Sequence, residues 1–119
     1  MAKPQSPEEL QPLTPPVFHI LMALADGERH GYGIMQEVAR QSDGQYRIGP
    51  GTLYDNLQKL MTQGIVEESA SPARNDDPRR RYYRLTRFGR ALLSAEVERL
   101  DTVIREARIH LRAHPRRAT

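Results

Sequence analysis

The sequence predicts a mainly α-helical fold with a small β-hairpin. Three amphipathic helical patterns come first, two short strand patterns follow, and a long helix with heptad spacing comes last. This order of elements predicts a winged helix-turn-helix that carries a C-terminal dimerisation helix. The 119 residues leave room for one domain with one hydrophobic core and short extensions.

The first helix is predicted to begin after Thr14, because a capping hydroxyl there precedes two prolines that need no amide partner. Apolar side chains then recur along residues 17–24 at the spacing of one helical face. Residues 1–13 are rich in proline and poor in apolar groups, so we expect a flexible N-terminal arm. Within this arm, residues 6–9 have the composition of a single capped helical turn.

Two further helices follow the first one. The second is predicted from about residue 32 to residue 41, and Gly44 lies in the turn that ends it. The third follows Pro50 and ends at Gly64, a typical C-terminal cap. On a helical wheel, one side of the third helix is apolar and predicted to be buried: Leu53, Leu57, Leu60 and Met61.

The opposite face of the third helix is the first candidate site. It offers hydroxyl, amide, carboxylate and ammonium groups, which can meet base edges or phosphates in a DNA major groove. Gly51 at the helix start also lets a phosphate approach the backbone amides. The candidate DNA-contacting residues of this helix are Gly51, Thr52, Tyr54, Asp55, Asn56 and Lys59. Taken alone, such a face is also typical of an ordinary solvated helix.

A β-hairpin is predicted from two strand patterns, residues 65–68 and 79–85, on either side of a polar loop. Strand alternation turns Tyr83 and Leu85 inward and Tyr82 outward. Arginines crowd the tip and base of the hairpin: Arg74, Arg79, Arg80 and Arg81. Because dense like charges repel one another, a nearby polyanion is favoured, with neutralisation by acidic loop residues as the alternative.

The last helix is predicted over residues 87–112, behind a capping Thr86, and carries a heptad seam. The seam residues are Leu93, Val97, Leu100, Ile104, Ala107 and Leu111. A helix of about 25 residues is roughly 37 Å long, too long for a three-helix core to cover. We therefore expect its distal half to pair with a second chain, with folding back onto the first helix as the alternative. The chain is thus divided into a DNA-binding domain (14–86), a dimerisation helix (87–112) and a flexible tail (113–119).

The composition favours a polyanionic partner. The chain has 18 basic and 15 acidic side chains, and its sequence pI is about 9.6. Of those 18, only Lys3 and Lys59 are lysines, so 16 are arginines. Arginine suits bidentate recognition of phosphate and guanine, although a GC-rich genome produces the same bias.

Other sequence features bear on location and on other kinds of site. There are no cysteines, so disulfides and thiolate metal sites are excluded and a reducing cytoplasm is expected. The N-terminus lacks a signal-peptide pattern, and the apolar stretch at residues 20–25 is too short to span a bilayer. We therefore expect a cytoplasmic protein with no membrane partner.

Four short motifs together resemble the PadR family of bacterial transcriptional regulators. They are HGYGI at residues 30–34, GTLY at 51–54, QGI at 63–65, and RYYRLT at 81–86 with Gly89 after it. The resemblance covers about residues 13–95, and the joint spacing of the motifs is specific although each is weak alone. It implies a cytoplasmic homodimer, usually a repressor, that contacts DNA through the third helix and the hairpin, which is called the wing.

The resemblance also implies which residues face the groove and what the last helix does. Carried over by position, the groove-facing residues are Thr52, Tyr54, Asp55, Asn56 and Lys59, with Arg79 and Arg80 on the wing. The single C-terminal helix resembles the compact subgroup, in which this helix dimerises and effector binding varies. Some compact relatives bind flat aromatic drugs through tryptophan at the dimer interface. This chain has no tryptophan, so the identity of a small-molecule effector stays open.

Two other classes of protein fit the sequence less well. An enzyme is disfavoured because no P-loop, nucleophile elbow or dinucleotide fingerprint is present. His110 and His114 have the i, i+4 spacing of metal ligands, but we expect a solvated surface there, at an arginine-rich helix end without a nearby acid. A winged helix that binds protein or RNA would expose a continuous apolar patch, which Tyr46, Tyr54 and Tyr82 do not form. No catalytic residue, metal or cofactor is therefore predicted.

Overall fold

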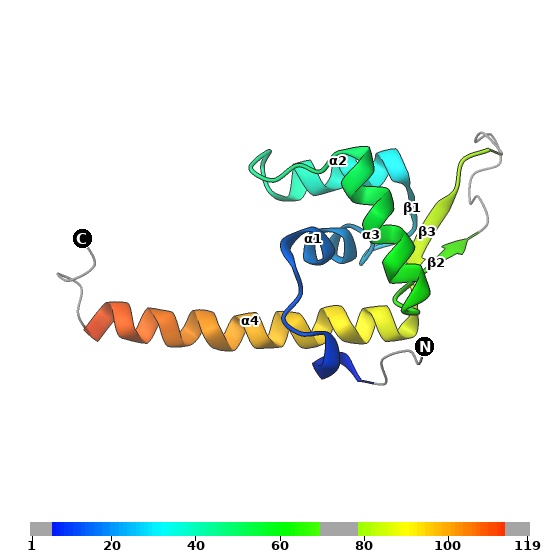
Figure 1. Cartoon of the computed structure of the whole chain (residues 1–119). Coiled ribbons are helices and arrows are strands. Elements are labelled where there is room, and N and C mark those ends of the chain that lie inside the picture. Colours follow the sequence, from blue (N-terminus) through cyan, green and yellow to red (C-terminus); the bar gives the residue numbers. More distant parts are fainter. Residues whose placement is uncertain (1–5, 70–78, 114–119) are drawn as a thin grey trace.

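The computed structural model describes residues 6–69 and 79–113. A winged-helix head rests on the first half of a long C-terminal helix, whose second half projects beyond the head (Figure 1). In chain order the elements are η1 (Pro7–Leu10), α1 (Pro15–Ala23), β1 (Arg29–His30), α2 (Gly31–Gln41), α3 (Pro50–Thr62), β2 (Val66–Ser69), β3 (Tyr82–Leu85) and α4 (Arg87–Ala113). The predicted winged helix-turn-helix is confirmed.

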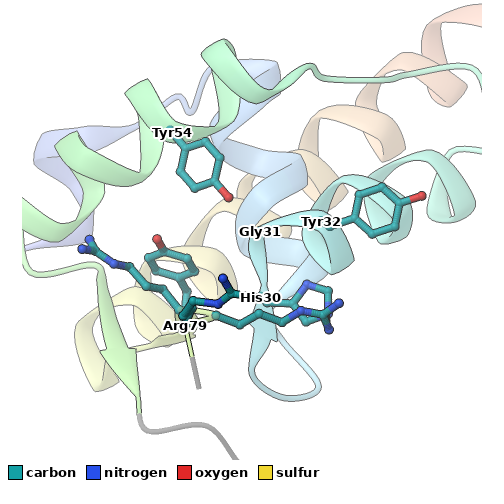
Figure 2. Close-up of a pocket in the computed structure, with 8 residues that line it drawn as sticks. His30, Gly31, Tyr32, Tyr54 and Arg79 are labelled. Atoms are coloured by element: carbon teal, nitrogen blue, oxygen red, sulfur yellow. The ribbon is translucent and has the colours of Figure 1, made fainter. Parts of the chain in front are cut away.

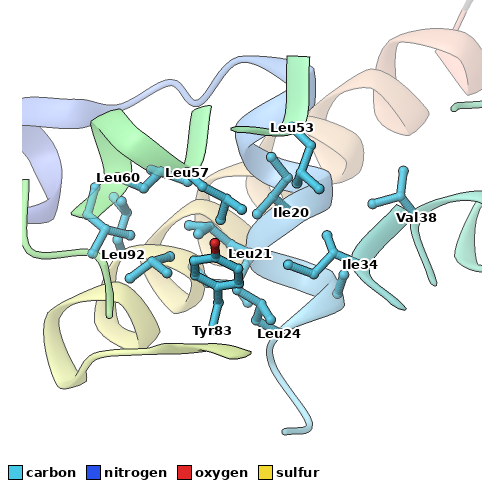
Figure 3. Packing of buried hydrophobic residues seen from close by; sticks show 14 residues of the cluster. Ile20, Leu21, Leu24, Ile34, Val38, Leu53, Leu57, Leu60, Tyr83 and Leu92 are labelled. Carbon is cyan, nitrogen blue, oxygen red and sulfur yellow. The ribbon is translucent and has the colours of Figure 1, made fainter. Parts of the chain in front are cut away.

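The hydrophobic core lies where the first three helices meet the proximal half of α4 (Figure 3). Its labelled members are Ile20, Leu21, Leu24, Ile34, Val38, Leu53, Leu57, Leu60, Tyr83 and Leu92. Fully burying an aliphatic side chain of this size stabilises the fold by about 1.5–3 kcal/mol. The core therefore holds α3 firmly against α1 and leaves the other face of α3 to solvent.

The C-terminal end of α3 is closed by a glycine cap. Gly64 has a φ of 76°, a left-handed conformation that glycine adopts without a steric penalty. The Ile65 amide donates to the Leu60 carbonyl at 2.9 Å, and the Gly64 amide donates to the Met61 carbonyl at 3.1 Å. These two bonds satisfy carbonyls that the helix itself leaves unpaired, so the prediction of Gly64 as a cap is confirmed.

Thr86 joins the end of α3 to the start of α4. Its hydroxyl accepts a hydrogen bond from the Gly89 amide at 3.0 Å and donates to the Gly64 carbonyl at 2.6 Å. The predicted cap of the last helix is thus present. Thr14, by contrast, precedes α1 as predicted, but within the described residues its hydroxyl makes no capping hydrogen bond.

The connection between α2 and α3 is held by side chains of its own. The Ser42 hydroxyl accepts from the Tyr46 amide at 2.9 Å and donates to the Val38 carbonyl at 3.0 Å. The ring of Tyr46 stacks on His19 of α1, with centroids 4.3 Å apart and planes 15° apart. This connection is longer than the tight turn of the simplest helix-turn-helix, and these contacts fix the direction in which α3 leaves it.

The sheet has three strands in the order β1-β3-β2, one more than the predicted hairpin. β1 pairs with β3, with His30 opposite Tyr82. A strand of two residues is too short to leave a periodic pattern in the sequence. The prediction that Tyr82 points outward is wrong, since only 8% of it is exposed and its ring lies edge-on to His30. The extra strand covers it.

The prediction of a flexible arm is wrong for residues 6–13, and residues 1–5 lie outside the described residues. The side chain of Gln11 and the backbone amide of Leu13 each donate to the carboxylate of Glu96 at 3.0 Å. Arg99 adds two more bonds to the same carboxylate, at 2.8 and 2.9 Å. The buried Glu96 on α4 therefore fastens the N-terminal segment to that helix. Its sequence position alone gave no sign of these partners.

The first part of α4 has residues buried in the core, whereas its last part is exposed. Leu93, which was predicted to lie in the dimer seam, is 9% exposed and packs in the core of its own chain, so that prediction is corrected. Every residue from 101 to 113 is exposed. The alternative that the distal half folds back onto α1 is therefore not what the structure shows. The predicted tail began at residue 113, but α4 includes Ala113, and residues 114–119 lie outside the described residues.

Candidate nucleic-acid interface

The polar residues predicted on α3 lie on the side away from the core. Gly51, Thr52, Asp55 and Lys59 are exposed, as are Gln58 and Thr62. Asn56 is half-buried, and its amide donates to the Thr52 carbonyl at 2.8 Å, which fixes that side chain against its own helix. The predicted buried side is also borne out by Leu53, Leu57 and Leu60, each at most 2% exposed. The helix therefore offers a continuous polar face long enough to enter a major groove.

Tyr54 leaves this face sideways and reaches toward α2. It is 49% exposed, and Figure 2 shows its hydroxyl directed at Gly31, the first residue of α2. A Cβ atom at Gly31 would overlap the Tyr54 hydroxyl oxygen. The glycine of the HGYGI motif therefore has a steric role: it makes room for the tyrosine of the GTLY motif.

A hollow of about 310 Å³ lies between the start of α2, Tyr54 of α3 and the base of the wing (Figure 2). Three of the arginines predicted to contact DNA line it: Arg79, Arg80 and Arg81. All three are exposed. Arg74, the fourth predicted wing arginine, lies outside the described residues. The structure thus brings Tyr54 of α3 and three wing arginines together around one concave surface, whereas the lining includes none of Thr52, Asp55, Asn56 and Lys59.

Two arginines of the wing form cross-strand ion pairs with β2. Arg84 Nε lies 2.9 Å from a Glu67 oxygen, and Arg81 Nη1 lies 3.4 Å from a Glu68 oxygen. Exposed pairs of this kind contribute at most about 1 kcal/mol, so they leave both arginines able to bind an anion. These two acids come from the neighbouring strand. The acidic loop residues of the alternative, Asp76 and Asp77, lie outside the described residues.

Other arginines have architectural roles. Arg29 Nε donates to the Ala23 carbonyl, and Arg90 Nη2 donates to the Ala25 carbonyl, both at 2.8 Å. Together they satisfy carbonyls at and beyond the C-terminal end of α1. The arginine bias of the composition is therefore only partly a feature of the proposed binding surface.

His30 is a residue of this surface that was not predicted from the sequence. It lines the hollow, and its Nδ1 accepts a hydrogen bond from the Gly33 amide at 3.0 Å, which caps the start of α2. Its Nε2 lies 3.2 Å from Arg80 Nη1. The HGYGI motif was the available signal, but histidine is an unusual helix cap and its orientation could not be derived from the motif.

Tyr83 forms the inner wall of the hollow. It is 3% exposed, and burial raises the pKa of its hydroxyl, with smaller contributions from Tyr54 and Glu68. The hydroxyl therefore stays protonated and can act as a hydrogen-bond donor. The wall of this surface is neutral and its rim is cationic.

The structure also bears on the predictions about a metal site and about a membrane span. His110 does have an acid nearby, contrary to the expectation, because its Nε2 lies 3.1 Å from a Glu106 oxygen. Its predicted partner His114 lies outside the described residues. Among residues 6–69 and 79–113, no group of three or more histidine or acidic side chains could hold a metal ion. None of the helices in that part of the chain combines the length and apolar character that a bilayer span requires.

Comparison with known proteins assigns the chain to a family. The model of the transcriptional regulator PadR-like family matches residues 20–95. The chain belongs to the PadR-like family. It is 42% identical over 90 residues to Transcriptional regulator Rv3488 of Mycobacterium tuberculosis, a match that covers 75% of this chain and 78% of that protein.

Solved structures of PadR proteins share the fold. A PadR family regulator from Clostridium difficile matches 81% of this chain and 97% of its own, with a TM-score of 0.68 and 20% identity. Bacillus subtilis PadR in complex with operator DNA matches 72% of this chain and 48% of its own, with a TM-score of 0.61 and 22% identity. The chain is thus a PadR-like transcriptional regulator, and the prediction of a regulator rather than an enzyme is confirmed.

Proposed function

We propose that this chain is a cytoplasmic repressor that binds a pseudo-palindromic DNA operator as a homodimer. The α3 helix of each copy enters the major groove, and the base of each wing contacts the flanking DNA backbone. The observation that carries this proposal is the concave surface at which Tyr54 of α3 meets three wing arginines, beside the exposed polar face of the same helix. The operator complex of Bacillus subtilis PadR supports it by analogy of fold.

The residues proposed to contact DNA divide into two groups. Thr52, Asn56 and Lys59 carry the hydroxyl, amide and ammonium groups that read base edges, whereas Arg79 and Arg80 carry positive charge to the phosphates. Gly51, Tyr54 and Arg81 support these contacts from the helix start and the hollow. Asp55 is the weakest of the proposed contacts, because its carboxylate is repelled by phosphate and must face a base donor.

The distal half of α4 supports the homodimer. Val103, Ile104 and Leu111 of this half, and Val97 just before it, are between 47% and 55% exposed. The seam residues Leu100 and Ala107 lie between them. A second copy of α4 packed antiparallel would cover this surface and give two α3 helices related by a twofold axis. Such a pair matches half-sites one helical turn of DNA apart.

The seam also offers a place for an effector. A hollow of about 340 Å³ lies between α1 and α4 and is lined by Phe18, Val97, Leu100, Asp101 and Ile104. Its walls are apolar apart from one carboxylate, so an apolar or phenolic compound suits it better than an anion. We propose that occupation of this hollow changes the packing of the dimer and releases the operator.

The direct test is selection of genomic DNA fragments by the purified protein, repeated with phenolic and drug-like compounds. We expect enrichment of a few fragments that contain inverted repeats near promoters, and sedimentation of a complex with two chains per duplex. Enrichment no better than that of random fragments would remove the proposed function. Binding by a single chain to a single half-site would remove the dimer but not the DNA-binding role. A transcription assay on a selected promoter would show repression or contradict it.

A further inference from the structure

The hydrogen bonding of His30 fixes which of its ring nitrogens carries the proton. A backbone amide can only donate, so the bond from the Gly33 amide to His30 Nδ1 requires a bare Nδ1. A neutral imidazole with a bare Nδ1 carries its hydrogen on Nε2. His30 therefore presents an N–H donor from Nε2 toward the wing.

This donor faces a second donor. His30 Nε2 lies 3.2 Å from Nη1 of Arg80, and a guanidinium nitrogen has no capacity to accept a hydrogen bond. Because both nitrogens donate and lie close together, one acceptor oxygen at this point of the hollow can bond to both. The imidazole cannot easily turn away, because its Nδ1 caps α2 and its ring lies edge-on to the buried Tyr82, with centroids 5.4 Å apart.

We propose that one DNA backbone phosphate binds at the mouth of the hollow, with its oxygens bridging His30 Nε2 and Arg80 Nη1. This inference rests on the proposed function and names the group that the hollow recognises. An anionic oxygen accepts hydrogen bonds from both nitrogens, and charge-assisted bonds of this kind are stronger than neutral ones. The hollow of about 310 Å³ is large enough for a phosphate group together with bridging water.

The position of the hollow favours a phosphate over a base edge. The pair lies at the start of α2, the first helix of the helix-turn-helix, and this helix crosses the DNA backbone when its partner α3 enters the groove. Tyr54 connects the two helices at this point, since its hydroxyl lies against Gly31 (Figure 2). A phosphate held here would therefore set the depth and register of α3. It would not select a sequence by itself.

His30→Asn is the most informative variant. Asparagine is a good helix cap, so its side-chain oxygen replaces Nδ1 as the acceptor for the Gly33 amide while the Nε2 donor is removed. On a duplex selected by the wild-type protein, we expect about a tenfold loss of affinity, typical of a hydrogen bond to a charged group. The salt dependence should stay the same, because the variant keeps the same charge. Arg80→Gln should lose affinity and also lower the slope of log affinity against log salt by about 0.9 per site.

Neutral methylphosphonates identify the phosphate itself. Replacing phosphates one at a time in the duplex should weaken wild-type binding at several positions. At one position in each half-site, the replacement should cost nothing further once His30→Asn and Arg80→Gln are both present. His110→Asn on the distal part of α4 is the control and should leave all of these values unchanged. Long-range ¹H–¹⁵N NMR on the unbound protein should show a protonated Nε2 and a bare Nδ1.

The outcomes separate this inference from the proposed function. Wild-type protein that selects no DNA would remove both. If the wild-type protein binds DNA and the His30→Asn variant binds it with the same affinity, the phosphate site alone is overturned. An NMR result that places the hydrogen of the His30 ring on Nδ1 would also overturn it. So would methylphosphonate substitutions that, at every position, weaken binding of the double variant as much as they weaken binding of the wild type.

Discussion

The hydroxyl of Tyr54 on α3 occupies the space that a side chain at residue 31 on α2 would need. Residues 31 and 54, which stand 23 positions apart in the sequence, are thereby joined at the surface proposed to meet DNA. The contact explains why the smallest residue begins α2. It also makes the orientation of one proposed DNA-contacting side chain depend on a residue of another helix.

Gly31→Ala should weaken operator binding several-fold with little change in the free energy of unfolding. The new methyl group meets only the end of the Tyr54 side chain, which can swing into solvent, and alanine favours a helix over glycine by up to about 1 kcal/mol. Affinity and denaturant unfolding measured on the same preparation check both parts. Gly33→Ala is the matched control, since its Cβ meets nothing closer than 3.4 Å. Equal affinities for the two variants would contradict the role of the contact.

The double variant Arg79→Ala, Arg80→Ala should weaken binding to all DNA sequences and reduce the salt dependence. For every phosphate that the protein no longer neutralises, the slope of log affinity against log salt falls by about 0.9. Lys59→Ala or Asn56→Ala should instead change which sequences are preferred. Binding titrations at several salt concentrations test this, with Arg40→Ala at the far end of α2 as a control for the removal of a positive charge. An unchanged slope in the double variant would remove the wing base from the interface.

Glu96 should contribute to stability against acid. Hydrogen bonds from Arg99, and then from Gln11 and Leu13, hold the pKa of Glu96 at about 2, below its usual 4.5, although burial acts in the opposite direction. Because the folded-state pKa is the lower one, this contribution is present above pH 4.5 and is lost as the pH falls toward 2. Denaturant unfolding of Glu96→Gln at neutral pH should show a loss on the order of 2 kcal/mol.

Between pH 4.5 and pH 2, the free energy of unfolding of Glu96→Gln should also change less with pH than that of the wild type. Glu98→Gln, two residues along on the exposed side of α4, is the control. A profile for Glu96→Gln that runs parallel to that of the wild type would show that the N-terminal segment is fastened by other means.

Leu100→Asp together with Ile104→Asp should dissociate the proposed dimer and lower operator affinity, because two carboxylates would be buried in an apolar seam. Thr102→Asp is placed on the opposite side of α4 and should leave the dimer intact. Sedimentation velocity at fixed concentration distinguishes these results. A dimer that survives the double substitution would place the interface elsewhere on the molecule.

Gly89→Ala should destabilise the fold by about 2–3 kcal/mol. Its Cβ would overlap the backbone carbonyl of Ile65, and neither group can swing aside because Thr86 bonds α4 to this same segment. Gly51→Ala meets no atom within 4 Å and serves as the control for adding a methyl group to a helix start. Equal unfolding midpoints for the two variants would contradict the close approach of α4 to Ile65.

Much of the fold could be predicted because its signals are local. The apolar stripe of α1, the glycine cap at Gly64 and the hydroxyl cap at Thr86 each depend on residues within a few positions of one another. The strand at Arg29–His30 and the N-terminal segment could not be predicted in this way. Their order comes from partners far along the chain, Tyr82 in one case and Glu96 in the other, and periodicity carries no information about such pairs.

The residues of the candidate site likewise divide into those that a local pattern predicts and those that depend on distant contacts. The polar face of α3 follows from a helical wheel, so its exposed members were correctly predicted. His30 was missed because its importance depends on a tautomer fixed by one backbone amide. Leu93 fits the heptad spacing as well as Leu100 does, but only the three-dimensional packing shows that the head of the same chain already covers it.

α4 is one unbroken helix from Arg87, beside the wing, to Ala113. In the proposed dimer, the direction in which the seam faces around the axis of α4, relative to the head, determines the distance between the two recognition helices. A single residue inserted after Leu100 would rotate the outer part of the seam by about 100° relative to the head. The spacing of operator half-sites would then change although every DNA-contacting residue stayed the same. Members of the family could therefore acquire new operator spacings through the length and phase of this helix.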